Sequence, residues 1–484
     1  MAHQNHLGEE SIGKLLLKYS IPAIIGMMVN ALYNIVDRMF IGRIPDVGSL
    51  ALTGVGITMP IMSILLAFGM LIGIGSTANI SLNLGRGKRD EAEKLIGSAI
   101  TLSLIVGVII TIIGLIFLNP ILNIFGASEN TLFYAKEYIT VILCGCTFNI
   151  LSFALNSTVR ADGNPKLASL TMIIGCGTNI VLDYLFVFVL NIGIKGAAFA
   201  TVISQALTFF IILYYYTKGN SNLKLKVENM KLKKNLVMMT FAIGIAPFAT
   251  QIANSLVQVV ANNSLKAYGN DLSIGAMTII GSINMVFMMP IFGINQGCQP
   301  IIGFNYGAKK YDRAKKTFII ATIAATVICT IGGMLIQLFP EFAISLFNND
   351  PELTAVAIKG VRMYLLMMPI VGINIVATSY FQSIGKAKMS MFVSLLRQVI
   401  LLIPFTLILP LFIGLDGVWA AAKPRFTSLV WKILYSYGTW VGTGIPAGLM
   451  TQTVLYRICT STHVVSLYCF LKVSFSLPCT SDRV

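Results

Sequence analysis

Charged side chains are scarce in this sequence of 484 residues. Asp, Glu, Lys and Arg together make up 11% of the chain, whereas a soluble protein carries about 25%. Apolar residues make up 56%, and mostly apolar runs recur that are long enough to cross the ~30 Å hydrocarbon core of a lipid bilayer. The shortage of charge excludes a soluble globular protein, and the apolar runs predict an all-α polytopic membrane protein.

The sequence also lacks the motifs of metal, redox and nucleotide chemistry. Its eight cysteines form no CxxC pair, which leaves packing inside the membrane as their expected role. No GxxxxGK[ST] loop is present, and GIGST from Gly73 lacks the lysine that would hold a phosphate. We therefore expect no cofactor, no structural metal and no use of ATP. The polar, acidic start of the chain differs from a cleaved signal peptide.

The positions of the basic residues indicate how the chain is oriented in the membrane, rather than a nucleic-acid site. The formal net charge is +16, but the bases gather in connectors after every second apolar run, and the opposite connectors are poor in them. By the positive-inside rule, these basic connectors and both termini face the cytoplasm. The predicted spans lie near residues 15–41, 50–77, 95–118, 133–159, 167–190, 194–217, 235–261, 272–298, 317–338, 357–383 and 388–413, with a twelfth that begins near Leu415.

The chain contains an internal duplication. The connector LGRGKRDEA from Leu84 recurs as YGAKKYDRA from Tyr306, 222 positions later, and the same offset maps Gly163 onto Gly385. Each half then holds six spans, so the two halves share one orientation and form two lobes with a substrate path between them. The predicted parts are a cytoplasmic N-terminus over 1–14, an N-lobe over 15–217, a basic linker over 218–234, a C-lobe over 235–422 and a tail over 423–484.

The tail changes in character after Ala422. The segment KPRFTSLVWKILYSYGTWVGTGIPAG mixes bases with scattered glycines, and the 222-residue repeat has no counterpart there. We hypothesise that a frameshift, truncation or fusion replaced the twelfth helix. The rival interpretation is a divergent helix from about Phe426 to Trp440.

Two acids, Asp37 and Asp183, lie inside otherwise apolar spans. A carboxylate inside a membrane costs several kcal/mol and usually marks an ion, proton or substrate site. Each acid lies about 25–29 Å along its helix from the basic residue near the start of the span, so both reach the same depth. Asn34 precedes Asp37 by three residues and Asn179 precedes Asp183 by four, which places each pair on one helix face. We predict that these four residues couple an ion, with Asn30 on the same face for substrate.

The second half keeps this polar face without the charge. Asn254 aligns with Asn30, Gln258 with Asn34, and Ala261 with Asp37, while the position of Asp183 falls near Pro404. Ion chemistry is therefore expected in the N-lobe alone, with Gln258 in a substrate role. The alternative is that both acids only lock helices together through buried hydrogen bonds.

Several segments resemble the multidrug and toxic compound extrusion (MATE) family. The resemblance extends from about Ser11 to Ala422 and rests on YSIPAIIGMMVNALYNIVDRMFIG, LGRGKRDEA, VRADGNPK and TNIVLDYLFVFVLNIGIKGAAFAT. It implies a secondary antiporter in the cell membrane that exports small organic cations in exchange for H⁺ or Na⁺. The N-lobe acids of the family map to Asp37 and Asp183, joined by Asn179 and Asn156.

Bulky cations also need adaptable apolar and aromatic contacts, for which Tyr33 and Met288 are candidates. Some family members use an additional carboxylate in span 7, where this chain has Gln251 and Gln258, so an acid-dependent C-lobe site is not expected. We expect a monomer in the lipid bilayer.

Two other functions remain open from the sequence. A flippase for lipid-linked saccharides uses similar bundles, but a pyrophosphate needs a basic site, whereas the acids here favour cations. An intramembrane aspartyl protease also uses two membrane carboxylates, but it requires YD and GxGD contexts, and this chain has VDR and LDY.

Overall fold

The computed structural model describes residues 7–45, 47–125, 127–269, 271–345, 351–365 and 368–421. Over these ranges the secondary structure is helical, without a β-strand. The described residues belong to one compact unit, Met1–Lys423. The predicted tail over 423–484, with its proposed frameshift, lies outside the described residues.

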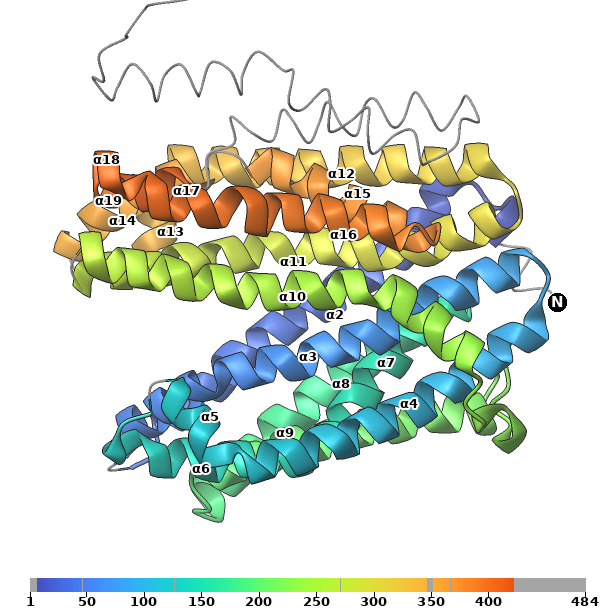
Figure 1. The fold of residues 1–484 in the computed structure, drawn as a ribbon, viewed down its shortest axis with the longest axis horizontal. Coiled ribbons are helices and arrows are strands. Elements are labelled where there is room, and N and C mark those ends of the chain that lie inside the picture. Colours follow the sequence, from blue (N-terminus) through green and yellow to red (C-terminus); the bar gives the residue numbers. More distant parts are fainter. Residues whose placement is uncertain are drawn as a thin grey trace, which may run out of the picture. The chain divides into compact units, whose positions relative to one another are not determined.

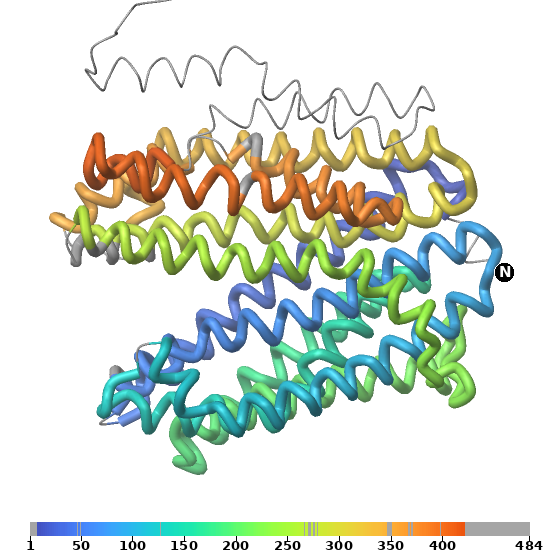
Figure 2. Tube along the Cα trace, in the orientation of Figure 1, coloured from blue at the N-terminus to red at the C-terminus, as the bar shows by residue number. Residues whose placement is uncertain are grey.

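The helices of each half follow one another along the chain (Figures 1 and 2). The first half contains α2 (Ile12–Gly42), α3 (Gly48–Gly85), α4 (Arg89–Ile116), α5 (Leu118–Ile124), α6 (Glu129–Cys144), α7 (Cys146–Ala161), α8 (Pro165–Tyr184), the π-helix η1 (Leu185–Val189) and α9 (Ile194–Thr217). After the short 3₁₀ helix η2 (Val227–Met230), the second half contains α10 (Lys234–Tyr268), α11 (Asp271–Gly307), α12 (Tyr311–Leu338), α13 (Pro340–Ser345), α14 (Pro351–Tyr364), α15 (Met368–Ser383), α16 (Ala387–Leu395), the π-helix η4 (Leu396–Leu402), α17 (Ile403–Ile408), α18 (Pro410–Ile413) and α19 (Leu415–Ala420).

Nine helices of the described residues are long and apolar enough to cross a membrane, and the bent pair α6–α7 makes a tenth. The sequence predicted this pair as one span over 133–159, but the helix bends by 55° at Gly145. A β-carbon at Gly145 would overlap the Val202 side chain of α9, so glycine lets α9 approach the bend. The number of twelve spans stays a prediction.

The duplication persists in the backbone. Four described positions in the first half adopt a positive φ, and three of them, all except Asn191, have a counterpart with positive φ in the second half, at an offset of 221 or 222 residues. Gly193 has φ 67° and ψ −144°, and Gly414 has φ 58° and ψ −139°, a conformation that only glycine adopts readily. The pairs are Gly87 and Lys309, Gly163 and Gly385, and Gly193 and Gly414.

An ion pair is also repeated, with its charges exchanged. Lys195 of α9 lies 2.8 Å from Glu137 of α6. At the matching positions, Lys359 of α14 lies 2.7 Å from Asp416 of α19. The two halves therefore use the same connection with opposite signs.

The two bundles cross closely at the end that carries the basic connectors, here called the basic end (residues 84–89, 162–166, 218–234, 306–311 and 384–388). A β-carbon on Gly244 of α10 would overlap the Leu71 carbonyl of α3, and one on Gly75 would overlap the Thr240 carbonyl. Gly297 of α11 likewise packs on Ser20 of α2. Figure 1 shows that α2 and α3 diverge from α10 and α11 toward the opposite end of the molecule. Small residues thus allow helix contact at one end of the molecule.

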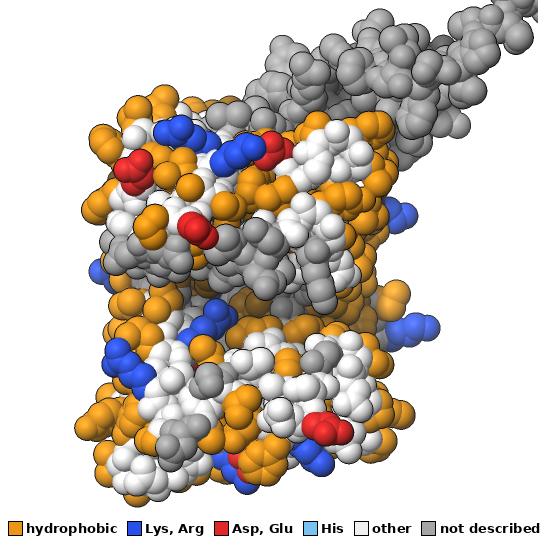
Figure 3. Space-filling model, turned by 90° about the vertical axis from the view of Figure 1, so that its left-hand side faces the viewer, with side chains coloured by type: hydrophobic (Ala, Val, Ile, Leu, Met, Phe, Trp, Pro, Cys, Tyr) orange, Lys and Arg blue, Asp and Glu red, His pale blue; other side chains and the backbone are white. Residues whose placement is uncertain are grey.

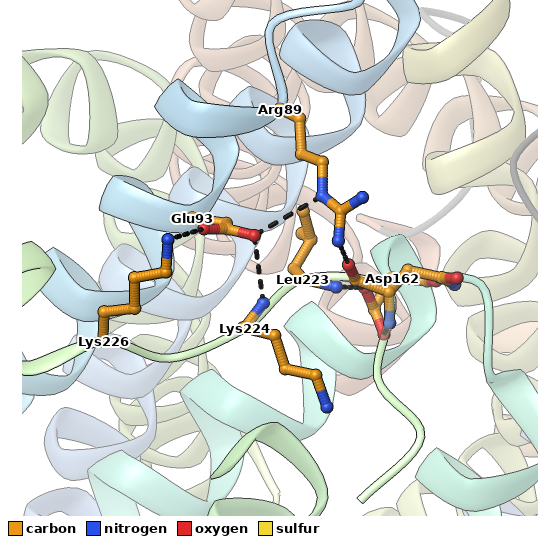
Figure 4. A network of polar contacts seen from close by, with 7 residues as sticks. Arg89, Glu93, Asp162, Leu223, Lys224 and Lys226 are labelled. Carbon is orange, nitrogen blue, oxygen red and sulfur yellow. Dashed lines mark hydrogen bonds and ion pairs between the residues drawn. The ribbon is translucent and has the colours of Figure 1, made fainter. Parts of the chain in front are cut away.

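The linker between the bundles is fixed to the first bundle through Asp162 (Figure 4). Its carboxylate accepts hydrogen bonds from the Tyr215 hydroxyl at 2.5 Å, the Leu223 amide at 2.8 Å and the Asn222 amide at 3.0 Å. Asn222 also donates through its side chain to the Asp162 carbonyl at 2.6 Å. Burial raises the pKa of the Asp162 carboxyl group to about 6, against the lowering effect of these donors.

A second acid, Glu93 of α4, holds the next part of the linker. Its carboxylate lies 3.4 Å from Arg89 and 3.8 Å from Lys226, and it accepts the Lys224 amide at 3.2 Å. Arg89 in turn donates to the Asn222 carbonyl. Residues 222–226 are therefore held on the first bundle by buried carboxylates.

The segment before α2, residues 7–10, makes the reciprocal contact with the second bundle. Arg313 of α12 donates to the Glu10 carbonyl at 2.6 Å, Asn305 of α11 donates to the Leu7 carbonyl at 3.1 Å, and Lys310 donates to the Gly8 carbonyl at 3.0 Å. The segment that precedes the first long helix of each half is therefore held on the other half.

Candidate functional site

The two predicted acids meet in the first bundle. Asp37 lies near the end of α2 and Asp183 near the end of α8, both are buried, and their side chains are hydrogen-bonded to each other. A hydrogen bond between two carboxyl groups requires a proton on one of them. The other oxygen of Asp37, Oδ1, has no hydrogen-bond partner among the described residues. The pair can therefore hold a proton or offer oxygen ligands to a cation.

A local irregularity follows the second acid. The π-helix η1 begins two residues after Asp183 and continues α8 from Leu185 to Val189. Such segments interrupt the regular hydrogen-bond ladder and are frequent at functional sites. Here the change in winding lies beside the only pair of acids that the described spans bring into contact.

Polar side chains of α6, α8 and α9 extend the acid pair. Asn179 donates to the Thr201 hydroxyl at 3.3 Å, and Thr201 also forms a hydrogen bond with Tyr138. Tyr138 and Tyr33 both lie close enough to interact electrostatically with both acids. Thr201 was not predicted, because a single threonine in the IKGAAFAT segment carries no signal of its own; the structure assigns it by proximity.

One polar contact of this site is repeated in the second bundle. Asn30 of α2 forms a hydrogen bond with Cys176 of α8. At the equivalent positions, the Gln398 amide nitrogen donates to the Asn254 side-chain oxygen at 2.5 Å. The acid pair beyond it has no such counterpart, since Ala261 and Phe405 stand near those positions. The scaffold is duplicated, but the acidic site exists only once in the described spans.

Two predicted site residues form their hydrogen bonds with groups other than the acids. Asn34 donates to the Asn30 carbonyl of its own helix at 2.7 Å. Asn156 donates to the Ala168 carbonyl at 2.7 Å and the Thr171 hydroxyl at 2.9 Å, about 12 Å along α8 from Asn179. Spacing placed Asn34 on the face of Asp37, and its amide nitrogen bonds to the backbone of that same helix. The family resemblance alone named Asn156, and its hydrogen bonds hold it near the start of α8.

The two predicted substrate residues of the second half lie apart from this cluster. Gln258 is exposed on α10, and Met288 is buried on α11. The role of Gln258 and Met288 in substrate binding therefore stays a prediction.

Figure 3, which views the end of the molecule opposite the basic end, shows a recess between the two halves.

Two helical bundles of duplicated design, with one buried acid pair, define a two-lobed membrane transporter. A family model described as MatE matches residues 22–185 and 247–408, which is more than half of the chain. The chain belongs to this family, the MATE transporters. The predicted all-α, two-lobed, multi-pass membrane fold is confirmed, and the protein is a transporter rather than an enzyme.

Individual relatives agree over nearly the full length. The multidrug export protein MepA of Staphylococcus haemolyticus is 28% identical over 431 residues, which covers 88% of this chain and 94% of that protein. The solved structure of the MATE multidrug transporter DinF-BH is 38% identical, with a TM-score of 0.83 over 89% of this chain and 96% of that one. An outward-facing multidrug resistance MATE transporter matches in fold, with a TM-score of 0.81, 24% identity, and coverage of 86% of this chain and 93% of that chain.

Proposed function

We propose that this protein is a secondary antiporter that exports cationic, amphipathic drugs and other toxic compounds in exchange for H⁺ or Na⁺ by alternating access. The observation that carries the proposal is the hydrogen-bonded pair of Asp37 and Asp183, buried in one lobe of a duplicated fold. A buried pair that exchanges a charge as the lobes move links the ion gradient to the substrate. The names of the relatives, a multidrug export protein and a multidrug transporter, support drug export, and the acid pair supports a cationic substrate.

The contact between the carboxyl groups favours a proton as the coupling ion. When the two carboxyl groups share a proton, the pair carries one negative charge. Release of that proton leaves two neighbouring carboxylates, which attract a cation. Each pH unit across the membrane supplies about 1.4 kcal/mol per proton, and each 100 mV supplies about 2.3 kcal/mol per charge. One proton is therefore enough to drive export against a tenfold gradient of substrate. A sodium ion would use the same oxygens, with amide oxygens from Asn179 and Asn34.

The substrate is proposed to bind beside the acids. Tyr33 supplies an aromatic face for an organic cation, and Asn30 supplies a polar contact about two turns from Asp37. Asn156, Gln258 and Met288 would line other parts of the path as the lobes move.

The basic end is proposed to face the cytoplasm, with the N-terminus on the same side and the chain in the plasma membrane. The basic connectors support this orientation through the positive-inside rule, and the close helix crossings at that end would separate a path between the lobes from the cytoplasm. The transporter is proposed to act as a monomer without a cofactor.

Efflux of the cationic dye rhodamine 6G from proteoliposomes under an imposed pH gradient tests the proposal, first without sodium and then with a sodium gradient. Wild type should export the dye, while Asp37→Asn and Asp183→Asn should each lose at least tenfold in rate, because neither variant can release and rebind the shared proton. Asp312→Asn, a change of the same kind at an exposed position of the basic end, should keep the wild-type rate. Gradient-driven efflux that survives in both acid variants would sink the coupling assignment.

A further inference from the structure

A buried arginine in the first bundle has no ionic partner among the described residues. Arg160 lies in the last turn of α7 and is 3% exposed. Its guanidinium donates to the Asn156 carbonyl at 3.3 Å and contacts the Met172 sulfur at 3.4 Å, while its Nε has no hydrogen-bond partner in the described part of the chain. No carboxylate of the described chain forms an ion pair with it. A buried cation of this kind is costly unless an anion compensates it.

The surrounding structure does not account for this charge. The carbonyl groups at the C-terminal end of α7 partly stabilise the positive charge of Arg160. An exposed arginine would gain the same stabilisation, so these carbonyls do not explain why Arg160 is buried. Asp162, two residues later, is directed to the linker instead. The matching position of the second bundle is Gln382, which is 6% exposed. The fold therefore accepts a neutral side chain of similar reach at this position.

We propose that Arg160 is the binding site for a single negative charge, either a halide ion or a carboxylate, at the basic end of the first bundle. A guanidinium has five N–H donors, and within the described part of the chain Arg160 makes two contacts, one of them to a weakly accepting thioether. An anion in the place of the Met172 sulfur would accept charge-assisted hydrogen bonds from the N–H groups on that side of the Arg160 guanidinium. Methionine is flexible enough to move aside.

This site is separate from the acid pair but touches the same helices. Met172 and Asp183 both lie on α8, eleven residues or about 16 Å apart. The Met172 sulfur also lies 3.4 Å from the place of a β-carbon on Gly26 of α2. An anion at Arg160 would therefore sit against α2 and α8, the helices that carry Asp37 and Asp183.

The free-ion source is tested by thermal unfolding of the purified full-length protein during a chloride titration in a chloride-free HEPES background. Chloride bound at Arg160 should raise the Tm of wild type by roughly 2–5 °C. Arg160→Gln, which copies the second bundle, should lose this rise. Arg43→Gln, which removes an exposed arginine, should keep it and so controls for general salt effects.

The carboxylate source is tested with two dyes that share one cationic ring system: rhodamine 6G, an ethyl ester, and rhodamine 19, its free acid. Fluorescence anisotropy should show the free acid binding wild type roughly tenfold more tightly, an advantage that Arg160→Gln removes. This arm rests on the proposed drug-binding function, whereas the chloride arm does not. Failure of both dyes to bind would count against that function, and not against the anion site.

Either response, if it depends on Arg160, supports the proposal and identifies the source. If Arg160→Gln does not fold, Arg160→Lys keeps a cation without the planar fork and should show a reduced response. Measurements on the wild-type protein are enough to overturn the proposal. They do so if chloride leaves the Tm unchanged and the dye with the free carboxylate binds no more tightly than its ester.

Discussion

Asp162 is the residue at which the linker and the first bundle are joined most directly. Its carboxylate accepts three hydrogen bonds, two from linker amides and one from Tyr215. An amide in its place has one accepting oxygen and two donors without acceptors, so the buried linker amides lose partners. These contacts give Asp162 a structural role, whereas ion coupling is proposed for Asp37 and Asp183.

Replacing Asp162 with asparagine should lower the free energy of unfolding by about 1–3 kcal/mol, the usual effect of leaving buried polar groups unsatisfied. The loss should depend on pH. The folded-state pKa is raised from 3.8 to about 6, so the folded protein binds more protons than the unfolded chain across this interval. Wild type then loses stability as pH rises from 4 to 6, by at most about 1.4 kcal/mol per pH unit.

The deficit of Asp162→Asn relative to wild type should therefore be widest near pH 4 and should narrow as pH rises through 6. Thermal unfolding in detergent over this pH range measures it, with Asp312→Asn as an exposed control. A deficit that widens with pH would mean that the ionised carboxylate is the favoured form in the folded protein.

Within each bundle, an ion pair connects helices at the end opposite the basic end, and the duplication has exchanged its charges. The pair Glu137–Lys195 connects α6 to α9, and Lys359–Asp416 connects α14 to α19. The two positions that form the ion pair are the same in both bundles, but the sign of the charge at each position differs. Both bundles place opposite charges at these two positions, in opposite order.

Reversing one charge with Glu137→Lys should lower the stability by about 0.5–1 kcal/mol, a small effect because Lys195 is half exposed. The double variant Glu137→Lys with Lys195→Glu reproduces the order found in the second bundle and should recover most of the loss. A double-mutant cycle of unfolding free energies measures the coupling. No recovery in the double variant would show that the two charges do not interact in solution.

At the scale of the whole molecule, contact between the lobes depends on glycines. Gly75 and Gly244 let α3 and α10 cross with backbone against backbone, and Gly297 does the same for α11 on α2. The linker and residues 7–10, which precede α2, are also held at this end by charged side chains. The lobes are therefore in close contact at the basic end through helix packing and through these hydrogen bonds.

Gly244→Ala should destabilise this closed crossing by about 1–3 kcal/mol, because the new methyl group overlaps the Leu71 carbonyl. The lobes should then separate more often at the basic end, and the amides of residues 71–75 and 240–244 should exchange hydrogen faster. Gly281→Ala on α11, where no atom lies within 4 Å of the new carbon, is the matched control. Equal exchange in both variants would contradict a crossing limited by glycine.

The sequence alone determined much of this protein. Long apolar runs can only satisfy their backbone in a membrane as helices, and the 222-residue offset between connectors predicted two lobes of one orientation. The position of Asp37 and Asp183 at one depth followed from the rise of a helix. These features are local or periodic, and a single chain displays them.

The tertiary structure decided which side chains meet. Helix rotation and packing turned Asp37 and Asp183 into a hydrogen-bonded pair, brought Thr201 to Asn179, directed Asn34 to its own backbone and held Asn156 several turns away. The bend at Gly145 and the buried charge of Arg160 also depend on neighbours that lie far away along the chain. Sequence spacing fixes the face and the height of a side chain, but its contact partner depends on how four separate helices pack together.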